Sequence, residues 1–167
     1  FQDLTIKYGK TETGAGIYMS ESTGEKDGQL TLENCIVSNN QCVLRSYPSS
    51  YRGAGIYVSG GLNIKNCLIS NNANGVGDGG GIYHRPLHEN SGLIIENSAI
   101  VYNSSIRYGS GFYFDNLNIS LPCKITNCTI SENSSTLSTG YSIYLKVLTN
   151  CFACINSCTI ADNSKGI

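Results

Sequence analysis

One short phrase recurs along the chain and constrains its fold more than any other feature. It places small residues, mostly glycine, ahead of an apolar residue and then an aromatic one. The five copies are 14–18 (GAGIY), 53–57 (GAGIY), 79–83 (GGGIY), 109–113 (GSGFY) and 140–144 (GYSIY). Five copies in 167 residues indicate a repeat protein, in which each unit buries its apolar face only by stacking on its neighbours.

A second phrase alternates with the first and sets the length of the repeat. It begins with an apolar residue, has Asn or Ser two positions later, and ends on another asparagine. Its copies are 32–40, 64–72, 95–103, 125–133 and 155–163, at steps of 32, 31, 30 and 30 residues. Each unit therefore has about 30 residues, with one glycine bend and one asparagine phrase.

Apolar residues alternate with polar ones over short stretches of each unit, as from Leu62 to Ile64 and from Leu93 to Ile95. This period of two is typical of half-buried strands, and no unit has a ten-residue stretch with a helical period. We predict an all-β fold, a right-handed parallel β-helix (solenoid) of about five coils of roughly 30 residues, one coil per repeat. The right hand is inferred from the coil length, because left-handed hexapeptide helices have shorter coils.

Stacked strands lie ~4.8 Å apart, so equivalent residues of successive units form columns along the solenoid. We expect three aliphatic columns inside: 17/56/82/112/143, 37/69/100/130/160 and 32/64/95/125/155. A fourth column consists of Asn40, Asn72, Asn103, Asn133 and Asn163. A carboxamide both donates and accepts, so we predict a structural asparagine ladder, with ligand binding as the alternative.

These two phrases resemble the paired GGAI-like and FxxN-like tetrapeptides of the chlamydial polymorphic outer membrane proteins. They are also similar to those of bacterial β-helical surface proteins and autotransporter passengers. The first motif stands at 14–17, 53–56, 79–82 and 109–112; the second stands at 37–40 (VSNN), 69–72 (ISNN), 100–103 (IVYN), 130–133 (ISEN) and 160–163 (IADN), with aliphatic residues in place of Phe. The resemblance covers essentially the whole chain and implies a secreted or cell-surface stalk or adhesin without catalytic residues.

Charge and hydropathy give no indication of nucleic-acid binding or of a membrane span. The net charge is −1, so no basic field favours nucleic acid, and no apolar run of ~18 residues predicts a transmembrane segment. No cofactor is expected. Neither end of the chain resembles a cap, so we expect 1–167 to be a single β-helix domain and a fragment of a longer solenoid. Its expected partners are further coils of the same chain or subunits stacked end to end.

The chain has eight cysteines, four of which share a column. Cys35 and Cys67 are neighbours there, as are Cys128 and Cys158. The coil spacing of ~4.8 Å falls within the ~4.4–6.8 Å that disulfides span between Cα atoms, so disulfides and buried free thiols both remain open. The motif 151–154 is Cys-x-x-Cys with no second pair facing it, so no metal site is expected. Among the four glycosylation sequons, Asn118 is the best acceptor because it lies in an insertion.

Insertions at 20–29, 41–52, 85–92 and 115–122 interrupt the pattern, and such loops often carry recognition. The 41–52 loop holds Arg45, Tyr47, Tyr51 and Arg52, a composition common at interfaces, although a plain surface loop is the alternative.

The tyrosines of the first phrase alternate with its apolar column, so we expect an exposed aromatic stripe of Tyr18, Tyr57, Tyr83, Tyr113 and Tyr144. Such a stripe stabilises neighbouring strands or provides a platform for sugar rings. His84 has the inward register of Val58 and Phe114. His88 follows it in the third insertion, and no carboxylate accompanies the pair. Tyr57, Tyr83, His84 and His88 complete the candidate ligand or partner surface.

The sequence favours a non-enzymatic secreted or cell-surface protein, acting as a stalk, adhesin or filament component, with a host-surface molecule or glycan as a ligand. The alternative is a polysaccharide-binding or polysaccharide-degrading β-helix, a lyase or glycosidase. Such enzymes need paired carboxylates, or an acidic calcium site beside a basic residue. The aspartates at 3, 27, 78, 115 and 162 are instead scattered singly.

Overall fold

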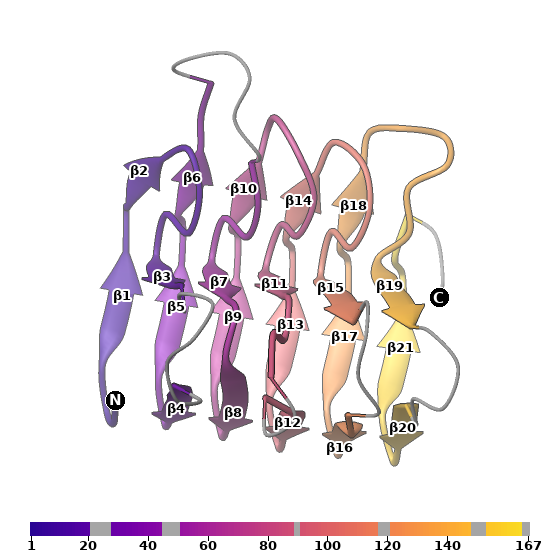
Figure 1. The fold of residues 1–167 in the computed structure, drawn as a ribbon. Helices are drawn as coiled ribbons and strands as arrows, with labels where there is room; N and C mark the ends of the chain where they lie inside the picture. The colour runs from indigo at the N-terminus through magenta and orange to yellow at the C-terminus, as the bar shows by residue number, and fades with distance from the viewer. Residues whose placement is uncertain (21–27, 45–50, 89–90, 117–120, 148–152, 165–167) are drawn as a thin grey trace.

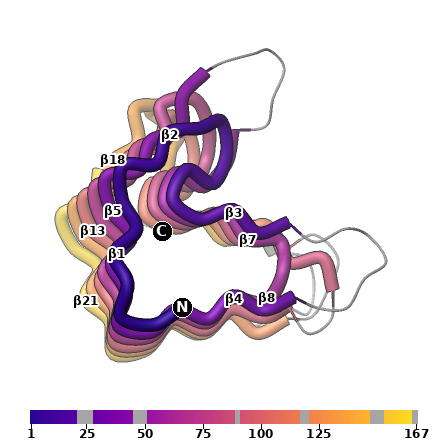
Figure 2. Tube along the Cα trace, turned by 90° about the vertical axis from the view of Figure 1, so that its left-hand side faces the viewer, coloured from indigo at the N-terminus to yellow at the C-terminus, as the bar shows by residue number. Residues whose placement is uncertain are grey.

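The computed structural model describes the chain except residues 21–27, 45–50, 89–90, 117–120, 148–152 and 165–167 (Figure 1). Its strands are short, all pair in parallel, and stack into four sheets that run side by side along one axis. Each turn of the chain contributes one strand to each sheet in the same order (Figure 2). This is the all-β parallel solenoid predicted from the two phrases.

Each sheet is named after its first strand. The β1 sheet contains β1 (Thr5–Lys7), β5 (Ile36–Ser38), β9 (Leu68–Ser70), β13 (Ala99–Val101), β17 (Thr129–Ser131) and β21 (Thr159–Ala161). The β2 sheet contains β2 (Lys10–Thr11), β6 (Gln41–Cys42), β10 (Ala73–Asn74), β14 (Ser104–Ser105) and β18 (Ser134–Ser135). The β3 sheet contains β3 (Ile17–Met19), β7 (Ile56–Val58), β11 (Ile82–His84), β15 (Phe112–Asn116) and β19 (Ile143–Val147). The β4 sheet contains β4 (Gln29–Glu33), β8 (Gly61–Lys65), β12 (Leu93–Glu96), β16 (Cys123–Thr126) and β20 (Ala153–Asn156).

The corners of the coil use residues that tolerate a left-handed backbone. Between the β4 and β1 sheets, Asn34, Asn66, Asn97, Asn127 and Ser157 have φ between 50° and 53°. Asparagine adopts this conformation more readily than other side chains because its short amide can bond locally. The residue that stands two positions into each second phrase, asparagine in four copies and Ser157 in the fifth, therefore turns the chain from one sheet to the next.

The core is continuous along the axis and contains the three expected aliphatic columns. Ile56, Ile82 and Phe112 are fully buried and pair in register across β7, β11 and β15. Period-two alternation places these side chains inward because successive residues of a strand point to opposite faces.

The asparagine ladder forms beside this core. Side-chain Nδ2 atoms donate to the next Oδ1 along the axis at 2.9 Å (Asn40 to Asn72), 3.0 Å (Asn72 to Asn103), 3.0 Å (Asn103 to Asn133) and 3.1 Å (Asn133 to Asn163). Each Oδ1 also accepts the backbone N–H of the preceding asparagine. These carboxamides thus satisfy polar backbone groups in the bend between the β1 and β2 sheets.

The tyrosine column differs from the expectation. Tyr18 is 58% exposed, but Tyr57, Tyr83 and Tyr113 are buried, so an exposed stripe is wrong for these three. The rings stack along the axis with centroids 4.6 Å apart for Tyr83 and Tyr113 and 5.7 Å apart for Tyr57 and Tyr83. The cause is the segment that joins the β2 and β3 sheets, which curls back over the outer face of the β3 sheet (Figure 2). From this segment, Tyr108 packs against the tyrosine cluster.

Candidate functional site

Two surface regions bring chemistry-bearing side chains together. The first, here called the charged cluster, consists of Asp115, Tyr83, Arg85 and Lys146 on the outer face of the β3 sheet. The second, here called the amide groove, follows the corner between the β4 and β1 sheets.

Asp115 is the centre of the charged cluster. It follows Tyr113 by two residues on β15, so both side chains point outward. Tyr83 donates through Oη to Oδ2 of Asp115 at 2.9 Å, Lys146 Nζ lies 3.3 Å from Oδ1, and Arg85 Nε lies 3.8 Å from Oδ2. The Asp115 side chain is only 6% exposed. One nearly buried carboxylate thus joins three successive coils.

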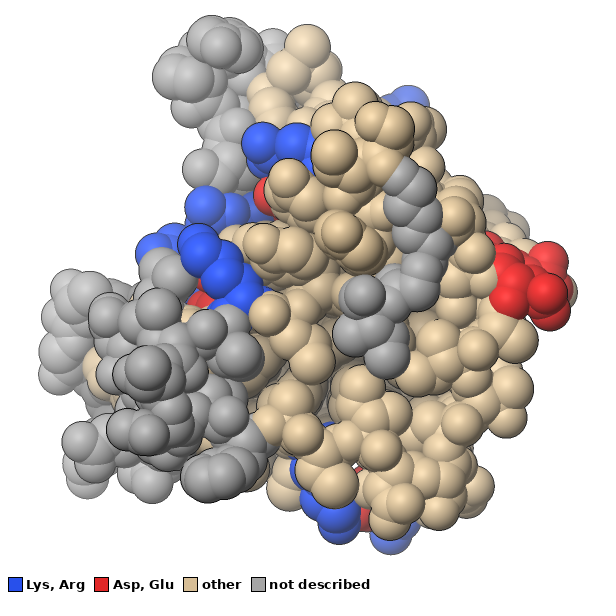
Figure 3. Space-filling model, turned by 90° about the vertical axis from the view of Figure 1, so that its right-hand side faces the viewer, with Lys and Arg blue, Asp and Glu red and all other residues tan. Residues whose placement is uncertain are grey.

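A second ion pair lies on the covering segment. Arg107 Nη2 lies 3.0 Å from Oδ2 of Asp78, whose Oδ1 accepts the backbone N–H of Tyr108 at 3.1 Å. The Arg52 guanidinium lies 5.2 Å from the ring centroid of Tyr83, a cation–π distance. Figure 3 shows basic side chains at the left, the top and the bottom of this view, with small patches of acidic surface beside them and a separate acidic patch at the right. The Tyr83 side chain therefore contacts a guanidinium on its ring and a carboxylate at its hydroxyl.

The phenols beside these charges hold their protons tightly. Burial raises the pKa of Tyr83 far above its ordinary value, Asp115 raises it further, and Arg52 opposes the shift only in part. Burial and then Asp115 raise the pKa of Tyr113 as well. At neutral pH both groups are protonated, so Tyr83 acts as a fixed hydrogen-bond donor to Asp115.

His84 is a core residue, which corrects its place in the candidate ligand surface. It is fully buried, its ring stacks on Phe114 with centroids 5.3 Å apart, and its Nε2 donates to the carbonyl of Gly60 at 2.6 Å. Burial lowers the pKa of His84 to about 4. The inward register inferred from Val58 and Phe114 is confirmed, and a neutral imidazole results.

The rest of the candidate partner surface is only partly assembled in the described residues, where Arg52 lies over Tyr83 and Tyr57 stacks on Tyr83. Tyr51 is buried like Tyr57 and Tyr83, which corrects the expectation that these rings face a ligand. Arg52 and His88 are partly buried. Arg45, Tyr47 and the proposed glycosylation site Asn118 lie outside the described residues.

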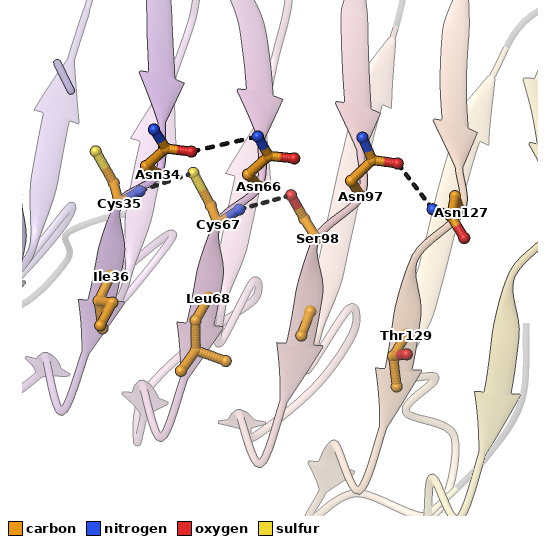
Figure 4. Close-up of a pocket in the computed structure, with 11 residues that line it drawn as sticks. Asn34, Cys35, Ile36, Asn66, Cys67, Leu68, Asn97, Ser98, Asn127 and Thr129 are labelled. Atoms are coloured by element: carbon orange, nitrogen blue, oxygen red, sulfur yellow. Dashed lines mark hydrogen bonds between the residues drawn. The ribbon is translucent and has the colours of Figure 1, made fainter. Parts of the chain in front are cut away.

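The amide groove has a volume of about 610 Å³ and extends across four coils. One side carries Asn34, Asn66, Asn97 and Asn127; the other carries Ile36, Leu68, Ala99 and Thr129; Cys35, Cys67 and Ser98 lie between (Figure 4). None of these lining residues is charged. The sequence analysis missed this groove, although the asparagine two residues into each second phrase was a visible signal for it.

Hydrogen bonds run along the asparagine side of the groove but not through its middle. Asn66 Nδ2 donates to Asn34 Oδ1 at 3.2 Å, and Asn127 Nδ2 donates to Asn97 Oδ1 at 2.8 Å. Among the residues drawn in Figure 4, no hydrogen bond joins Asn66 to Asn97. The Oδ1 of Asn66 and the Nδ2 of Asn97 face one another across this interruption (Figure 4).

The cysteines behind the groove are free thiols in the structure. The backbone N–H of Cys35 donates to Sγ of Cys67 at 3.3 Å, and that of Cys128 donates to Sγ of Cys158 at 3.4 Å. Burial raises the pKa of the Cys67 and Cys128 thiols. Of the two alternatives that the sequence left open, the structure has the thiols, which serve as acceptors between coils.

Two general features complete the description of the site. Within the described part of the chain, no three His, Cys, Asp or Glu residues are grouped so that they could hold a metal ion. Over the same residues, no helix has the length and apolar character needed to cross a membrane.

Comparison with known proteins agrees with this architecture. Neither the curated proteins nor the solved structures contain a match to this chain. The family model described as the right-handed β-helix region matches residues 1–167, and the chain therefore belongs to the right-handed β-helix family.

Proposed function

We propose that this chain is a non-enzymatic β-helix, secreted or displayed at the cell surface, that acts as a stalk, adhesin or filament component. The observation that carries this proposal is the state of Asp115. Its carboxylate is nearly buried and held by Tyr83, Arg85 and Lys146, so it ties three coils together. A carboxylate engaged in this way supports rigidity along the axis, which a stalk requires.

A second candidate function, polysaccharide degradation, is favoured by the same cluster. Asp115 lies beside two basic side chains on an outer sheet face, which brings one acidic and two basic groups together. Against this candidate, the pKa of Tyr83 and of Tyr113 is raised, so neither phenol is ready to accept a proton at neutral pH.

The two candidates differ in a measurable product. Incubation with uronic-acid polymers, with and without Ca²⁺, followed by ultraviolet detection of unsaturated products and by reducing-end analysis, separates them. The stalk or adhesin proposal expects no product above the buffer control. Product that disappears in an Asp115→Asn variant would establish the enzyme instead.

For partners, we propose further coils of the same kind, from the same chain or from subunits stacked end to end. Two apolar hollows support this. One, of about 440 Å³, includes Phe1, Ile17 and Leu30 in its lining, and the other, of about 260 Å³, includes Ile143 and Leu145. A stacked coil would cover these side chains and pair with the adjacent strands. Light scattering of the purified chain across a concentration series tests for assembly, and a mass that stays monomeric would argue against stacked subunits.

A further inference from the structure

We propose that Asn127 is the acceptor of an N-linked glycan, which the fold carries on the outside of the corner between the β4 and β1 sheets. The inference rests on the proposed secreted or cell-surface location, because N-linked glycans occur on the surface of secreted proteins. It goes beyond that proposal by assigning a covalent modification to one residue in the described part of the chain.

The first argument is a combination of residue types that occurs at one corner. The acceptor sequence needs Ser or Thr two positions after the asparagine, with any residue except Pro between them. Asparagine occupies this corner in four coils, and the residues two positions later are Ile36, Leu68, Ala99 and Thr129. Of these four corners, only Asn127-Cys128-Thr129 therefore has the acceptor sequence.

The second argument is exposure. Asn127 has a φ of 51° in the turn that precedes β17, and the residue is exposed there. Thr129, on β17, is exposed as well (Figure 4). The next corner along the axis has Ser157, whose side chain is short and also exposed. An oligosaccharide attached to Nδ2 of Asn127 can therefore extend into water.

The third argument is a count of amide hydrogens. The Nδ2 of asparagine has two hydrogens, and glycosylation replaces one of them. Within the described residues, Nδ2 of Asn127 donates one hydrogen bond, to Oδ1 of Asn97 at 2.8 Å. The second hydrogen is thus available for substitution, and the first can keep its bond to Asn97.

The same count excludes the two ladder asparagines that also have the acceptor sequence. Nδ2 of Asn103 donates to the carbonyl of Ile69 at 2.9 Å and to Oδ1 of Asn133 at 3.0 Å. Nδ2 of Asn133 donates to the carbonyl of Ile100 at 2.8 Å and to Oδ1 of Asn163 at 3.1 Å. Both residues are fully buried, so a glycan on either would break a buried hydrogen bond and meet the packed core.

The modification is a glycosyl transfer from an oligosaccharide linked to a polyprenyl pyrophosphate, catalysed by a transferase of the host cell. The bond between the anomeric carbon and the pyrophosphate oxygen breaks, and a bond from that carbon to Nδ2 of Asn127 forms. Nδ2 loses one proton, and the lipid pyrophosphate leaves. No oxidant or reductant is needed.

The test expresses the whole chain behind a secretory signal peptide in a eukaryotic cell line and analyses the protein from both medium and cells. Release of the glycan by a peptide N-glycosidase in heavy-oxygen water marks each modified asparagine as labelled Asp, which peptide mass spectrometry locates. Label at position 127, with none at Asn103 or Asn133, is the expected result. Thr129→Val should lower the occupancy of Asn127 by at least about tenfold, whereas Thr129→Ser should retain it.

A matched variant moves the site to another coil. Asn66 is exposed at the same corner with a φ of 52°, its Nδ2 donates to Oδ1 of Asn34 at 3.2 Å, and Cys67 follows it as Cys128 follows Asn127. It lacks only the hydroxyl residue two positions later. Asn127→Gln alone should remove the glycan, and adding Leu68→Thr to that variant should place one on Asn66.

Three results would overturn the inference: an unmodified Asn127 in the wild-type chain, including the case of a glycan on Asn118 alone; equal occupancy of Asn127 in the Thr129→Val and Thr129→Ser variants; or a glycan on Asn103 in protein whose thermal unfolding is unchanged. None of them would create product from uronic-acid polymers. Failure of this inference is therefore distinguishable from failure of the non-enzymatic proposal.

Discussion

The side chain of Asn72 donates through Nδ2 to Oδ1 of Asn103 at 3.0 Å, and the same oxygen accepts the backbone N–H of Asn72 at 3.0 Å. The Asn72 amide also donates to the carbonyl of Val37 in the preceding coil at 3.0 Å. Both asparagines are fully buried. Each hydrogen bond of the ladder therefore contributes to the stability of the fold, because leaving a buried polar group without its partner costs free energy.

Asn72→Ala is expected to lower the free energy of unfolding by ~1–3 kcal/mol, because it leaves buried groups of Asn40, Val37 and Asn103 without their partner. Urea denaturation measures the loss. Asn63→Ala, on the outward face of β8, is the control and should change stability by less than ~0.5 kcal/mol. Equal effects of the two substitutions would mean that the ladder carries no special stability.

Gly81→Ala is expected to destabilise the solenoid by ~1–3 kcal/mol through overpacking. A Cβ at this position would lie 2.5 Å from the carbonyl oxygen of Gly111 and 3.1 Å from the amide of Asn103. At Gly75, the nearest atom to an added Cβ is the carbonyl oxygen of Cys42 at 3.8 Å, an ordinary contact. Gly75→Ala is therefore the matched control, and thermal unfolding of both variants checks the difference.

Tyr83→Ser is expected to cost ~3–5 kcal/mol, because this ring is 2% exposed and its hydroxyl holds Asp115. In the exposed stripe that the sequence predicted, the same substitution would have been tolerated. Tyr18→Ser changes the same column where the ring is 58% exposed, and should cost less than ~1.5 kcal/mol. Similar losses at the two positions, measured by urea denaturation, would contradict the enclosed stack.

Acid should weaken the fold through His84. Its pKa is about 4 in the folded chain and 6.5 when exposed, so between these values the unfolded chain binds more protons. Stability is then fully present above pH 6.5 and falls by ~1.4 kcal/mol per unit as the pH drops toward 4. His84→Phe, which continues the stack with Phe114, should flatten this part of the pH profile. An unchanged slope in the variant would assign the acid sensitivity to other groups.

The thiols should differ sharply in reactivity. Cys154 is exposed, whereas Cys42 is buried and burial raises its pKa to about 11, so little thiolate forms there at pH 8. Iodoacetamide at pH 8, followed by peptide mass spectrometry, should label Cys154 and leave Cys42 unmodified until the chain unfolds. Unfolding without a reductant should then expose Cys35 and Cys67 to labelling. Protection of that pair alone would reveal a disulfide between their coils.

Sequence periodicity was enough to predict the architecture and the inner columns. A unit of about 30 residues that stacks on its neighbours places residues such as Ile56, Ile82 and Phe112 one above another, and the alternation along each strand decides which of them point inward. Asn72 and Asn103 could be assigned to one ladder for the same reason, since both close the same phrase. These features are local or repeat at a fixed step, so the chain encodes them directly.

Which outward-facing side chains are covered depends on the path of the less regular segments that connect the strands. Alternation placed Tyr83 opposite the core, but only the tertiary structure showed that the segment containing Tyr108 covers it. Arg85, Asp115 and Lys146 each stand two residues after the tyrosine of their phrase, so the repeat places them in one column, but only the structure showed that the Asp115 carboxylate is nearly buried between the two basic groups. The sequence by itself determined which residues stack along the axis, because stacking repeats the coil. Which outward side chains stay in water was decided by the connecting segments, because their contacts follow no period.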